Sequence, residues 1–330
     1  MDGLNPYSED FLDWLPIRVA PESGDWRVDW CRFGRQALRD PFFRGSVDHA
    51  LRLPFNQAFR RDTSITALLD WQQRSPGRPP TCFIFHASRC GSTLMAQMLA
   101  RLASHTVLSE PPTLDTVLRA HYFSPLTGDT QLAWTRALLS AYGQQRLGSE
   151  QALVVKLDAW NIFDLPLLQR AFPDTPWLFL YRDPLEIAVS QLRAPGAHMV
   201  PGMIGPSMLA FPQAEALAMS RPEFIARCLG RILAAGLARC QAFGGLAVNY
   251  EELPDALTGR LAPLFDLRAA DLPMAEAAAR QNAKQPDLPF EADRERKRRE
   301  AAPELIAQVN QWARGPYQAL EALRKSQLAE

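Results

Sequence analysis

The stretch FIFHASRCGSTL, residues 83–94, changes character in its middle. Its first residues are apolar, as in a buried strand, and its last residues begin a run with helical spacing, STLMAQMLARLA (92–103). A helix that begins directly after a strand offers unpaired N–H groups and a partial positive charge to an anion. The stretch therefore predicts either a seat for a phosphate group or an ordinary turn from sheet to helix.

The residue types between strand and helix favour the phosphate seat. Gly91 lets backbone amides approach an anion without a side chain in the way, and Ser92 and Thr93 add hydroxyl donors. Arg89 adds a planar, permanently charged fork. The ATP-binding pattern G-x-x-x-x-G-K-[ST] fits only at Gly91 and Thr93, because its lysine falls on Ser92. This mismatch argues against an ordinary ATPase.

The composition restricts the classes of partner. The chain has 330 residues, of which 47% are hydrophobic, and its 36 basic and 36 acidic side chains cancel. No global field therefore attracts nucleic acid or an anionic membrane, and an anion site has to be local. We find no secretory signal, no apolar run near the ~20 residues of a membrane span, and no metal-ligand spacing among the five cysteines. These observations predict a cytoplasmic protein without a metal.

Outside this stretch, short apolar runs alternate with helical segments. The runs are TCFIF (81–85), TVLS (106–109), ALVVK (152–156), PWLFLY (176–181) and LAVNY (246–250). They are apolar on both faces, which predicts an α/β fold with a doubly wound, mainly parallel sheet. Ligands of such sheets bind at the carboxyl ends of the strands.

The chain divides into two predicted regions. Residues 1–75 are rich in aromatic side chains, which predicts helices and loops packed on the main domain rather than a disordered leader. RSPGRPP (74–80) is typical of a linker, and residues 81–330 form the α/β domain with a helical C-terminal region.

A second candidate anion site follows the fourth apolar run, in YRDPLEIAVSQL (181–192). Asp183 is placed to cap a helix, Pro184 fits its first position, and Glu186 completes a capping box. Arg182 and Ser190 have no such structural explanation and are placed to converge on one anion. The alternative is a surface ion-pair arginine and an ordinary helical serine.

Both segments resemble sulfotransferase motifs. The family's 5′-phosphosulfate loop reads roughly P-[KR]-S-G-T-T after a strand, and Arg89, Gly91, Ser92 and Thr93 fit it. Cys90 replaces the usual serine of this loop, and Ser88 replaces the usual proline. The spacing of Arg182 and Ser190 is similar to that of the 3′-phosphate motif, and YEEL (250–253) is similar to a third family pattern. The resemblance covers residues 81–267 and not the N-terminal segment.

The resemblance implies a donor and a reaction. The donor would be 3′-phosphoadenosine 5′-phosphosulfate, the product 3′,5′-adenosine bisphosphate, and the acceptor a hydroxyl or amine of a small molecule, by in-line transfer without a metal. Arg89 would stabilise the leaving phosphate, with Lys156 as the second cation, and Tyr250 would lie near the adenine. The cofactor-binding residues would be Arg89, Cys90, Gly91, Ser92, Thr93, Arg182, Ser190 and Tyr250.

The general base is open among three residues. Many small-molecule sulfotransferases have a histidine two residues after the lysine, but Asp158 stands there in this chain. Glu110 is our first choice, on the expectation that a closed apolar site raises its pKa, and Asp158 and His86 are the alternatives. The alternative role for Glu110 is to position the acceptor or to pair with Arg89. For Cys90 we expect a packing role, the alternative being a thiol with a lowered pKa.

Other segments and rival functions complete the expectations. The loop GAHMVPGMIGPSMLAFP (196–212) is typical of a lid, and its methionines suit an adaptable apolar wall for the acceptor. Lys284 or the basic tract DRERKRRE (293–300) is a candidate for contacting the 3′-phosphate, the alternative for the tract being a solvated helix. The rival functions are a degenerate P-loop kinase and a sulfotransferase-fold protein that binds a nucleotide or partner without catalysis. The acceptor's identity and the oligomeric state are left open by the sequence.

Overall fold

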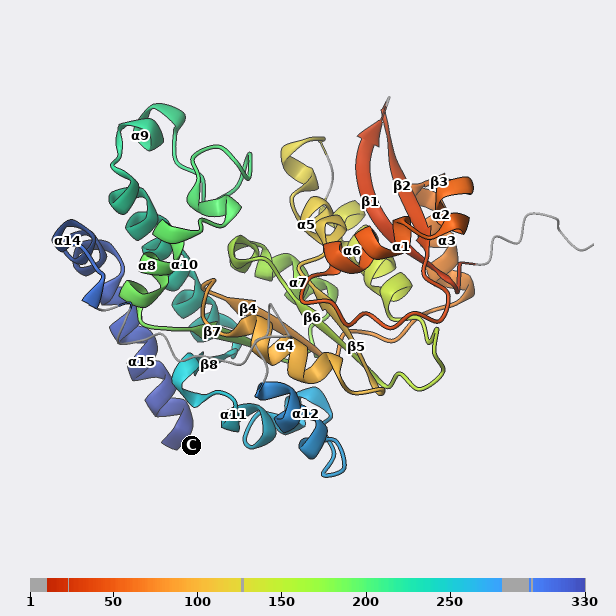
Figure 1. Ribbon diagram of the computed structural model, residues 1–330. Helices are drawn as coiled ribbons and strands as arrows, with labels where there is room; N and C mark the ends of the chain where they lie inside the picture. The colour runs from red at the N-terminus through yellow and green to blue at the C-terminus, as the bar shows by residue number, and fades with distance from the viewer. Residues whose placement is uncertain (1–10, 23, 126–127, 281–296, 298, 330) are drawn as a thin grey trace, which may run out of the picture.

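A sheet of five parallel strands forms the centre of the protein (Figure 1). The computed structural model describes residues 11–22, 24–125, 128–280, 297 and 299–329. The strand order is β5 (His105–Ser109), β6 (Ala152–Lys156), β4 (Cys82–His86), β7 (Trp177–Tyr181) and β8 (Leu246–Asn249). Each predicted apolar run forms one of these strands, so the predicted doubly wound α/β fold is confirmed.

Helices cover both faces of this sheet. The chain passes from β4 through α4 (Ser92–Ala100) toward one edge, and the later crossovers run the opposite way. Because such crossovers are right-handed, α4 lies on one face, and α7 (Leu165–Ala171) and α10 (Arg221–Phe243) lie on the other. The α4 face also carries α12 (Leu272–Ala279), which packs on α4.

The remaining helices surround this core. Along the chain, the segments that connect β5, β6, β7 and β8 also contain α5 (Pro112–Leu118), α6 (Gly128–Tyr142), α8 (Pro184–Arg193), α9 (Gln213–Ala218) and the 3₁₀ turns η1 (Ala120–Tyr122), η2 (Ala159–Asp164) and η3 (Ala197–Met199). After β8 come η4 (Tyr250–Glu252), α11 (Asp255–Thr258), η5 (Ala262–Phe265), α14 (Pro303–Trp312) and α15 (Arg314–Ala329). The described part after residue 250 is thus mainly helical, as predicted. None of the described helices is long and apolar enough to cross a membrane.

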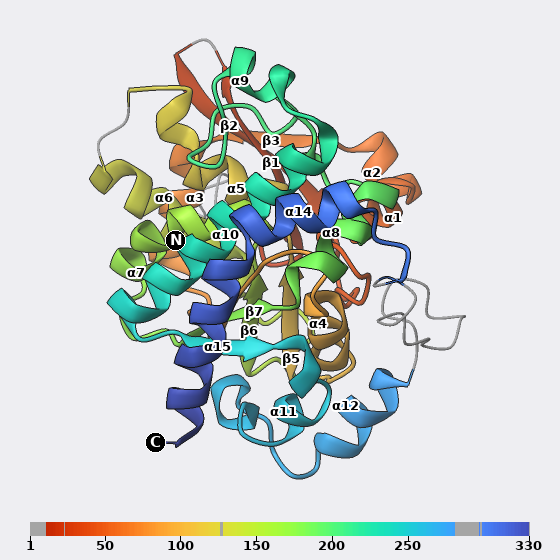
Figure 2. The same ribbon diagram turned by 90° about the vertical axis from the view of Figure 1, so that its left-hand side faces the viewer.

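The C-terminal helix α15 covers the exposed edge of the sheet at β8 (Figure 2). Glu321 of α15 accepts hydrogen bonds from the Tyr181 hydroxyl, at 2.6 Å, and from Asn249 Nδ2, at 2.8 Å. A covered edge cannot pair with another chain, so α15 protects the sheet as well as extending the core.

The N-terminal segment corrects one expectation. Residues 1–75 were predicted to be helices and loops, but the described part contains an antiparallel sheet in the order β1 (Trp14–Glu22), β2 (Asp25–Arg32) and β3 (Arg61–Ser64). Its helices are α1 (Phe43–Leu51), α2 (Pro54–Ala58) and α3 (Ile65–Arg74). β1 contains Pro16 and Pro21, which weaken a strand pattern. An edge strand tolerates them, and Pro16 lies where the pairing register shifts.

Direct contacts join this segment to the α/β unit. The rings of Trp26 and Trp134 lie 5.2 Å apart, and the buried Tyr142 hydroxyl donates to the carbonyl of Pro16. The connection after α3 lies against the end of α6, where Gly77 N donates to Ser140 Oγ at 2.8 Å. The predicted linker is therefore packed rather than free.

Gly236 provides a test of how tightly α10 packs on the sheet. A Cβ added there would lie 2.3 Å from Cε1 of Phe179 in β7. We expect Gly236→Ala to lower the free energy of unfolding by about 1–3 kcal/mol in urea denaturation, because the added methyl group overpacks the core. The matched control is Gly315→Ala in α15, where a Cβ would meet nothing within 4 Å. That control should be neutral or stabilising by up to about 1 kcal/mol, and equal effects of the two substitutions would contradict the packing argument.

Candidate active site

The loop between β4 and α4 has an unusual backbone. Ser88, Arg89 and Gly91 have positive φ angles of 64°, 49° and 86°. A Cβ on Gly91 would lie 2.6 Å from the Tyr250 ring, so both conformation and space require glycine. No side chain of the described residues caps the N-terminus of α4. The loop thus presents an open set of N–H donors, and strained residues of this kind cluster at functional sites.

Contacts from α8 hold this loop in place. Gln191 Nε2 donates to Ser88 Oγ at 2.9 Å, and Gln191 Oε1 accepts from the backbone N–H of Gly196 at 2.8 Å. Arg89 Nη2 donates to the carbonyl of Ala194 at 2.6 Å. The first predicted motif and the helix of the second are therefore physically joined.

The second motif brings Arg182 to the same region. Arg182 is buried, and its guanidinium lies 4.2 Å from the centroid of the Tyr250 ring. Its Nε donates to Glu186 Oε2 at 2.6 Å, so Arg182 is a buried ion-pair residue and not a surface one. Tyr250 therefore lies between Gly91 and Arg182. Ser190 lies half-buried further along α8.

The cap of α8 differs from the expected capping box. Asp183 caps the helix through the N–H of Leu185, at 2.9 Å, and Pro184 occupies the first helical turn, as predicted. The Glu186 carboxylate, however, accepts from Arg182. The charge of a neighbouring guanidinium is a stronger partner for this buried carboxylate than a backbone N–H.

A buried ion pair lies at the ends of β5 and β6. Lys156, with no exposed side-chain surface, pairs with Oε1 of Glu110, and its Nζ is 3.4 Å from Ser109 Oγ. The same ammonium lies 5.2 Å from the centroid of the Phe42 ring. Glu110 has a positive φ of 51°, which turns its carboxylate toward Lys156 at the carboxyl end of the sheet.

His86 is held as a hydrogen-bond acceptor on one side. Its Nδ1 accepts from the backbone N–H of Ser88 at 3.0 Å, so in the neutral ring Nε2 carries the proton. Nε2 lies 3.2 Å from Oε1 of Glu110, although the two groups are not aligned for a well-formed hydrogen bond. With Nδ1 occupied and Nε2 protonated, His86 is poorly suited to take a proton from a substrate.

The expected raised pKa of Glu110 is wrong. Burial by itself raises the pKa, but the ammonium of Lys156 and the ring of His86 outweigh it, so the pKa lies well below its usual range. Glu110 is therefore a weak base while it is paired. The sequence could not reveal this partner, because Lys156 reaches Glu110 only through the pairing of β5 with β6.

Asp158 has the opposite environment. Burial raises the pKa of Asp158 well above its usual range, and the neighbouring carboxylates of Glu110 and Asp115 raise it further. Its backbone N–H is fixed by Asn161 Oδ1 at 3.2 Å, which orients the start of η2. Of the three base candidates, Asp158 has the carboxylate whose pKa is moved toward neutrality.

Cys90 has the expected packing role. It is fully buried, and its Sγ donates to the carbonyl of Leu180 at 3.1 Å. Burial raises the pKa of its thiol to about 12, so the alternative of a lowered pKa is wrong.

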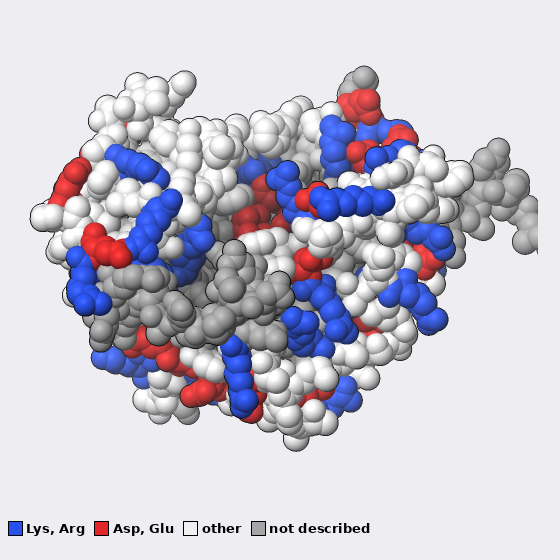
Figure 3. All heavy atoms as spheres, viewed as in Figure 1, with Lys and Arg blue, Asp and Glu red and all other residues white. Residues whose placement is uncertain are grey.

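Some of these groups line a pocket of about 280 Å³, whereas Lys156, Arg182, Ser190 and Tyr250 are not among its lining residues. Figure 3 shows a hollow between the region of α9 and the N-terminal strands, with acidic and basic side chains exposed in it. The pocket is lined by Arg89, Ser92, Thr93, Glu110 and Asp158, together with Phe42, His86, Ser88, Ala159, Trp160, Gly196, Ala197 and His198. Phe42, Trp160 and His198 were not predicted as site residues from the sequence. The first lies outside the resemblance, and the last was part of the quoted lid loop without being singled out.

The predicted lid loop is anchored in this structure. Arg119 Nη1 donates to the carbonyls of Ile204, at 2.6 Å, and Pro206, at 3.1 Å. Met203 and Met208 are 66% and 59% exposed, so two of the three methionines expected in an apolar wall face solvent. Other apolar side chains of the loop build that wall instead.

The predicted C-terminal basic contacts are largely outside the described residues. Lys284 lies there, as does most of the tract at 293–300. In the described part of that tract, Glu300 forms an ion pair with Arg193 of α8. No group of three or more His, Cys, Asp or Glu side chains suited to a metal ion occurs among the described residues.

Lys156→Met tests the balance of charge around Glu110. We expect a loss of about 2–4 kcal/mol in the free energy of unfolding at neutral pH, because a buried carboxylate loses its main counter-charge. Adding Glu110→Gln to this variant should restore most of the lost free energy of unfolding. In the wild type, the depressed pKa of Glu110 contributes stability above the unfolded-state value of about 4.3, and this is lost as pH falls toward the folded-state pKa.

In Lys156→Met, only the ring of His86 still opposes burial, so the pKa of Glu110 should rise relative to the wild type, and the stability that the wild type gains above about 4.3 should be reduced or lost. The gap between variant and wild type in urea unfolding should therefore widen from acid toward neutral pH. A gap independent of pH would mean that Glu110 does not sense Lys156.

The solved structures that resemble this chain include bacterial sulfotransferases. A sulfotransferase from Alicyclobacillus acidocaldarius gives a TM-score of 0.42 at 17% sequence identity, over 75% of this chain and 96% of that one. The sulfotransferase STF1 from Mycobacterium tuberculosis gives a TM-score of 0.35 at 17% identity, over 64% of this chain and 75% of that one. No family model and no curated protein matches the sequence.

Proposed function

We propose that this protein is a sulfotransferase that moves a sulfuryl group from 3′-phosphoadenosine 5′-phosphosulfate to a small-molecule acceptor. The observation that carries the proposal is the position of three cationic side chains, in two places, near Gly91. Arg89 belongs to the loop between β4 and α4, and Lys156 ends the neighbouring strand β6. Arg182 lies against the ring of Tyr250, which in turn lies against Gly91. A nucleotide with anionic groups at both ends of its adenosine matches two such seats along one sheet edge.

The chemistry of the residues fits this donor. The uncapped N-terminus of α4 supplies N–H donors, and Gly91 leaves room that a larger side chain would fill. Tyr250 supplies an aromatic surface next to the guanidinium of Arg182. Ser92 and Thr93 add hydroxyl groups at the start of the helix.

When bound, the donor supplies a sulfuryl group: a bond forms from the acceptor oxygen or nitrogen to sulfur, the bond from sulfur to the bridging phosphate oxygen breaks, and 3′,5′-adenosine bisphosphate leaves. Arg89 and Lys156 provide positive charge where negative charge accumulates on the leaving phosphate. Glu110 holds Lys156 in position and lies 3.2 Å from His86 Nε2. Glu110 is therefore a positioning residue in this proposal, in place of the base that the sequence suggested.

Asp158 is the group we assign to accept the acceptor's proton. It lines the same pocket as Arg89, and its raised pKa brings its basicity closer to that needed near neutral pH. Trp160 lies in the same pocket wall.

Isothermal titration calorimetry with 3′,5′-adenosine bisphosphate tests the donor site. We expect binding of this nucleotide and at least about tenfold weaker binding of ATP with magnesium, because the loop lacks the ATP-binding lysine. Arg182→Ala should weaken binding by about 1.5–3 kcal/mol through loss of a charge-assisted contact. Because that substitution leaves Glu186 buried without its partner, Arg182→Ala with Glu186→Gln is measured beside it. Arg18→Ala, in an exposed ion pair of β1, is the control.

The preference for ATP would instead indicate a kinase. An undiminished affinity in both Arg182 variants would remove this residue from the site.

Transfer of labelled sulfate tests the assignment of Asp158. The acceptor is the compound that reacts fastest in a mixed pool of small alcohols and amines. Turnover in the wild type should rise with pH as Asp158 loses its proton and then level off. Asp158→Asn should lower turnover by a factor of about 10²–10⁴ and should abolish the rise of turnover with pH. This variant should still bind 3′,5′-adenosine bisphosphate.

Glu110→Gln is the comparison, and its turnover should still rise with pH. The reverse pattern, in which turnover rises with pH in Asp158→Asn but not in Glu110→Gln, would assign the base role to Glu110. No transfer to any compound, with nucleotide binding intact, would favour a non-catalytic binding protein.

A further inference from the structure

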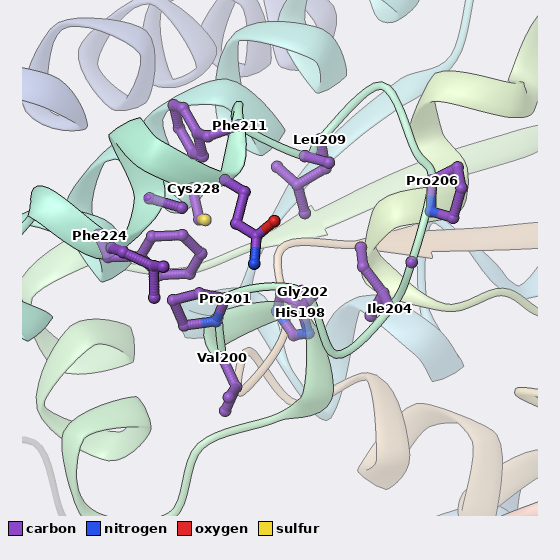
Figure 4. Close-up of a pocket in the computed structure, with 15 residues that line it drawn as sticks. His198, Val200, Pro201, Gly202, Ile204, Pro206, Leu209, Phe211, Phe224 and Cys228 are labelled. Atoms are coloured by element: carbon purple, nitrogen blue, oxygen red, sulfur yellow. The ribbon is translucent and has the colours of Figure 1, made fainter.

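A second cavity, of about 520 Å³, lies next to the candidate active site. The loop after α8 forms one side of it, and α9 and the first turns of α10 form the other (Figure 4). Figure 4 shows Ile204, Leu209, Phe211 and Phe224 around one space. None of the 15 lining residues carries a formal charge at neutral pH. An ionised ligand would therefore lose its hydration here without gaining a counter-charge from the lining residues. The guanidinium groups of Arg231 and Arg227 lie 3.7 and 5.1 Å from the centroid of the Phe211 ring, and they bind backbone carbonyls and Glu215.

Two arginines hold the loop that forms this cavity. Arg119 binds the carbonyls of Ile204 and Pro206, as described above. Arg231 Nη1 donates to the carbonyls of Leu209 and Ala210, both at 3.1 Å. These bonds satisfy the carbonyl groups of an irregular segment and leave its apolar side chains to line the space. The cavity is therefore a built feature of the fold.

His198 lines both this cavity and the candidate active site. It is 5% exposed, and its Nε2 has no hydrogen-bond partner among the described residues. Leaving a buried polar atom unpaired destabilises the fold by about 1–3 kcal/mol, and such atoms are rare in folded proteins. The unpaired nitrogen points to a ligand group that completes it.

The ring of His198 is held in position by its neighbours. It lies 5.5 Å from the ring of Trp160, and a Cβ on Gly196 would come within 3.0 Å of its Cε1. Glycine at 196 thus allows the imidazole to lie close against the backbone. Burial lowers the pKa of His198 to about 4, so the ring is neutral at physiological pH.

We infer that the cavity binds the apolar body of an uncharged hydroxyl compound, and that His198 Nε2 hydrogen-bonds to its hydroxyl group and directs it toward the pocket of Arg89 and Asp158. This inference rests on the proposed function and narrows its acceptor from any hydroxyl or amine to a neutral alcohol or phenol. An ammonium or a carboxylate on the acceptor's body has no counter-charge among the residues that line the cavity. In the reaction, the hydroxyl oxygen bonds to sulfur, the bridging phosphate oxygen leaves, and the hydroxyl proton passes to Asp158.

The test measures binding of 2-naphthol and of naphthalene to the full chain by fluorescence titration, without donor. His198→Leu should weaken 2-naphthol about 5- to 10-fold and leave naphthalene unchanged, because only the former has a hydroxyl to bind. His198→Gln, which keeps a polar group near the position of Nε2, should recover part of the loss. A purely structural role for His198 would change both affinities alike and would overturn the inference.

Three further measurements sharpen the result. Ala216→Phe, which fills the cavity from α9, should abolish binding of both compounds. The anionic 6-hydroxy-2-naphthoate should bind at least about tenfold more weakly than 2-naphthol. His49→Leu, on the exposed face of α1, is the control and should change neither affinity. Equal binding of the anionic and neutral compounds would contradict the inference.

The outcomes separate this inference from the proposed function. Failure of 2-naphthol to bind, with 3′,5′-adenosine bisphosphate bound normally, would overturn the inference alone. Absence of nucleotide binding, with the His198-dependent binding of 2-naphthol intact, would overturn the proposed function and with it the role of the cavity as an acceptor site.

Discussion

The burial of the Lys156 charge constrains much of the structure around it. An ammonium without solvent contact is costly unless it is paired, and Glu110 supplies the pairing from the end of the adjacent strand. To do so, Glu110 adopts a left-handed backbone conformation directly before Pro111, where the following proline already restricts the backbone. His86 lies against the same carboxylate and accepts from Ser88. The conformation of the loop between β4 and α4 is thus linked to the Lys156–Glu110 ion pair through His86.

The central sheet was predictable because its strands are buried on both faces. All residues of the run ALVVK are buried, so the strand is a continuous apolar run in the sequence and does not alternate between apolar and polar residues. The site residues at the strand ends were found for a related reason, since topology alone places the ends of parallel strands along one edge. Gly91 was recognisable from the pattern of the loop, and its conformation and its contact with Tyr250 explain why glycine is required there.

What the sequence could not show depends on contacts between distant segments. The pKa of Glu110 is set by a lysine on another strand, and a local view of apolar neighbours gave the wrong direction. β1 was missed because Pro16 is tolerated only through its edge position and its register shift, neither of which is visible locally. Phe42 and His198 reach the pocket from segments that carry no motif.

The place of Phe42 has a consequence for how such a protein changes over evolutionary time. A segment built around its own small sheet supplies an aromatic ring to the wall of the pocket and lies against the Lys156 ammonium. Substitutions that tilt this segment would reshape the pocket wall while the geometry of the parallel sheet stays intact. Under the proposed function, divergence in the choice of acceptor could therefore accumulate in residues remote from the chemical step, without a change in any of the residues proposed to bind the nucleotide.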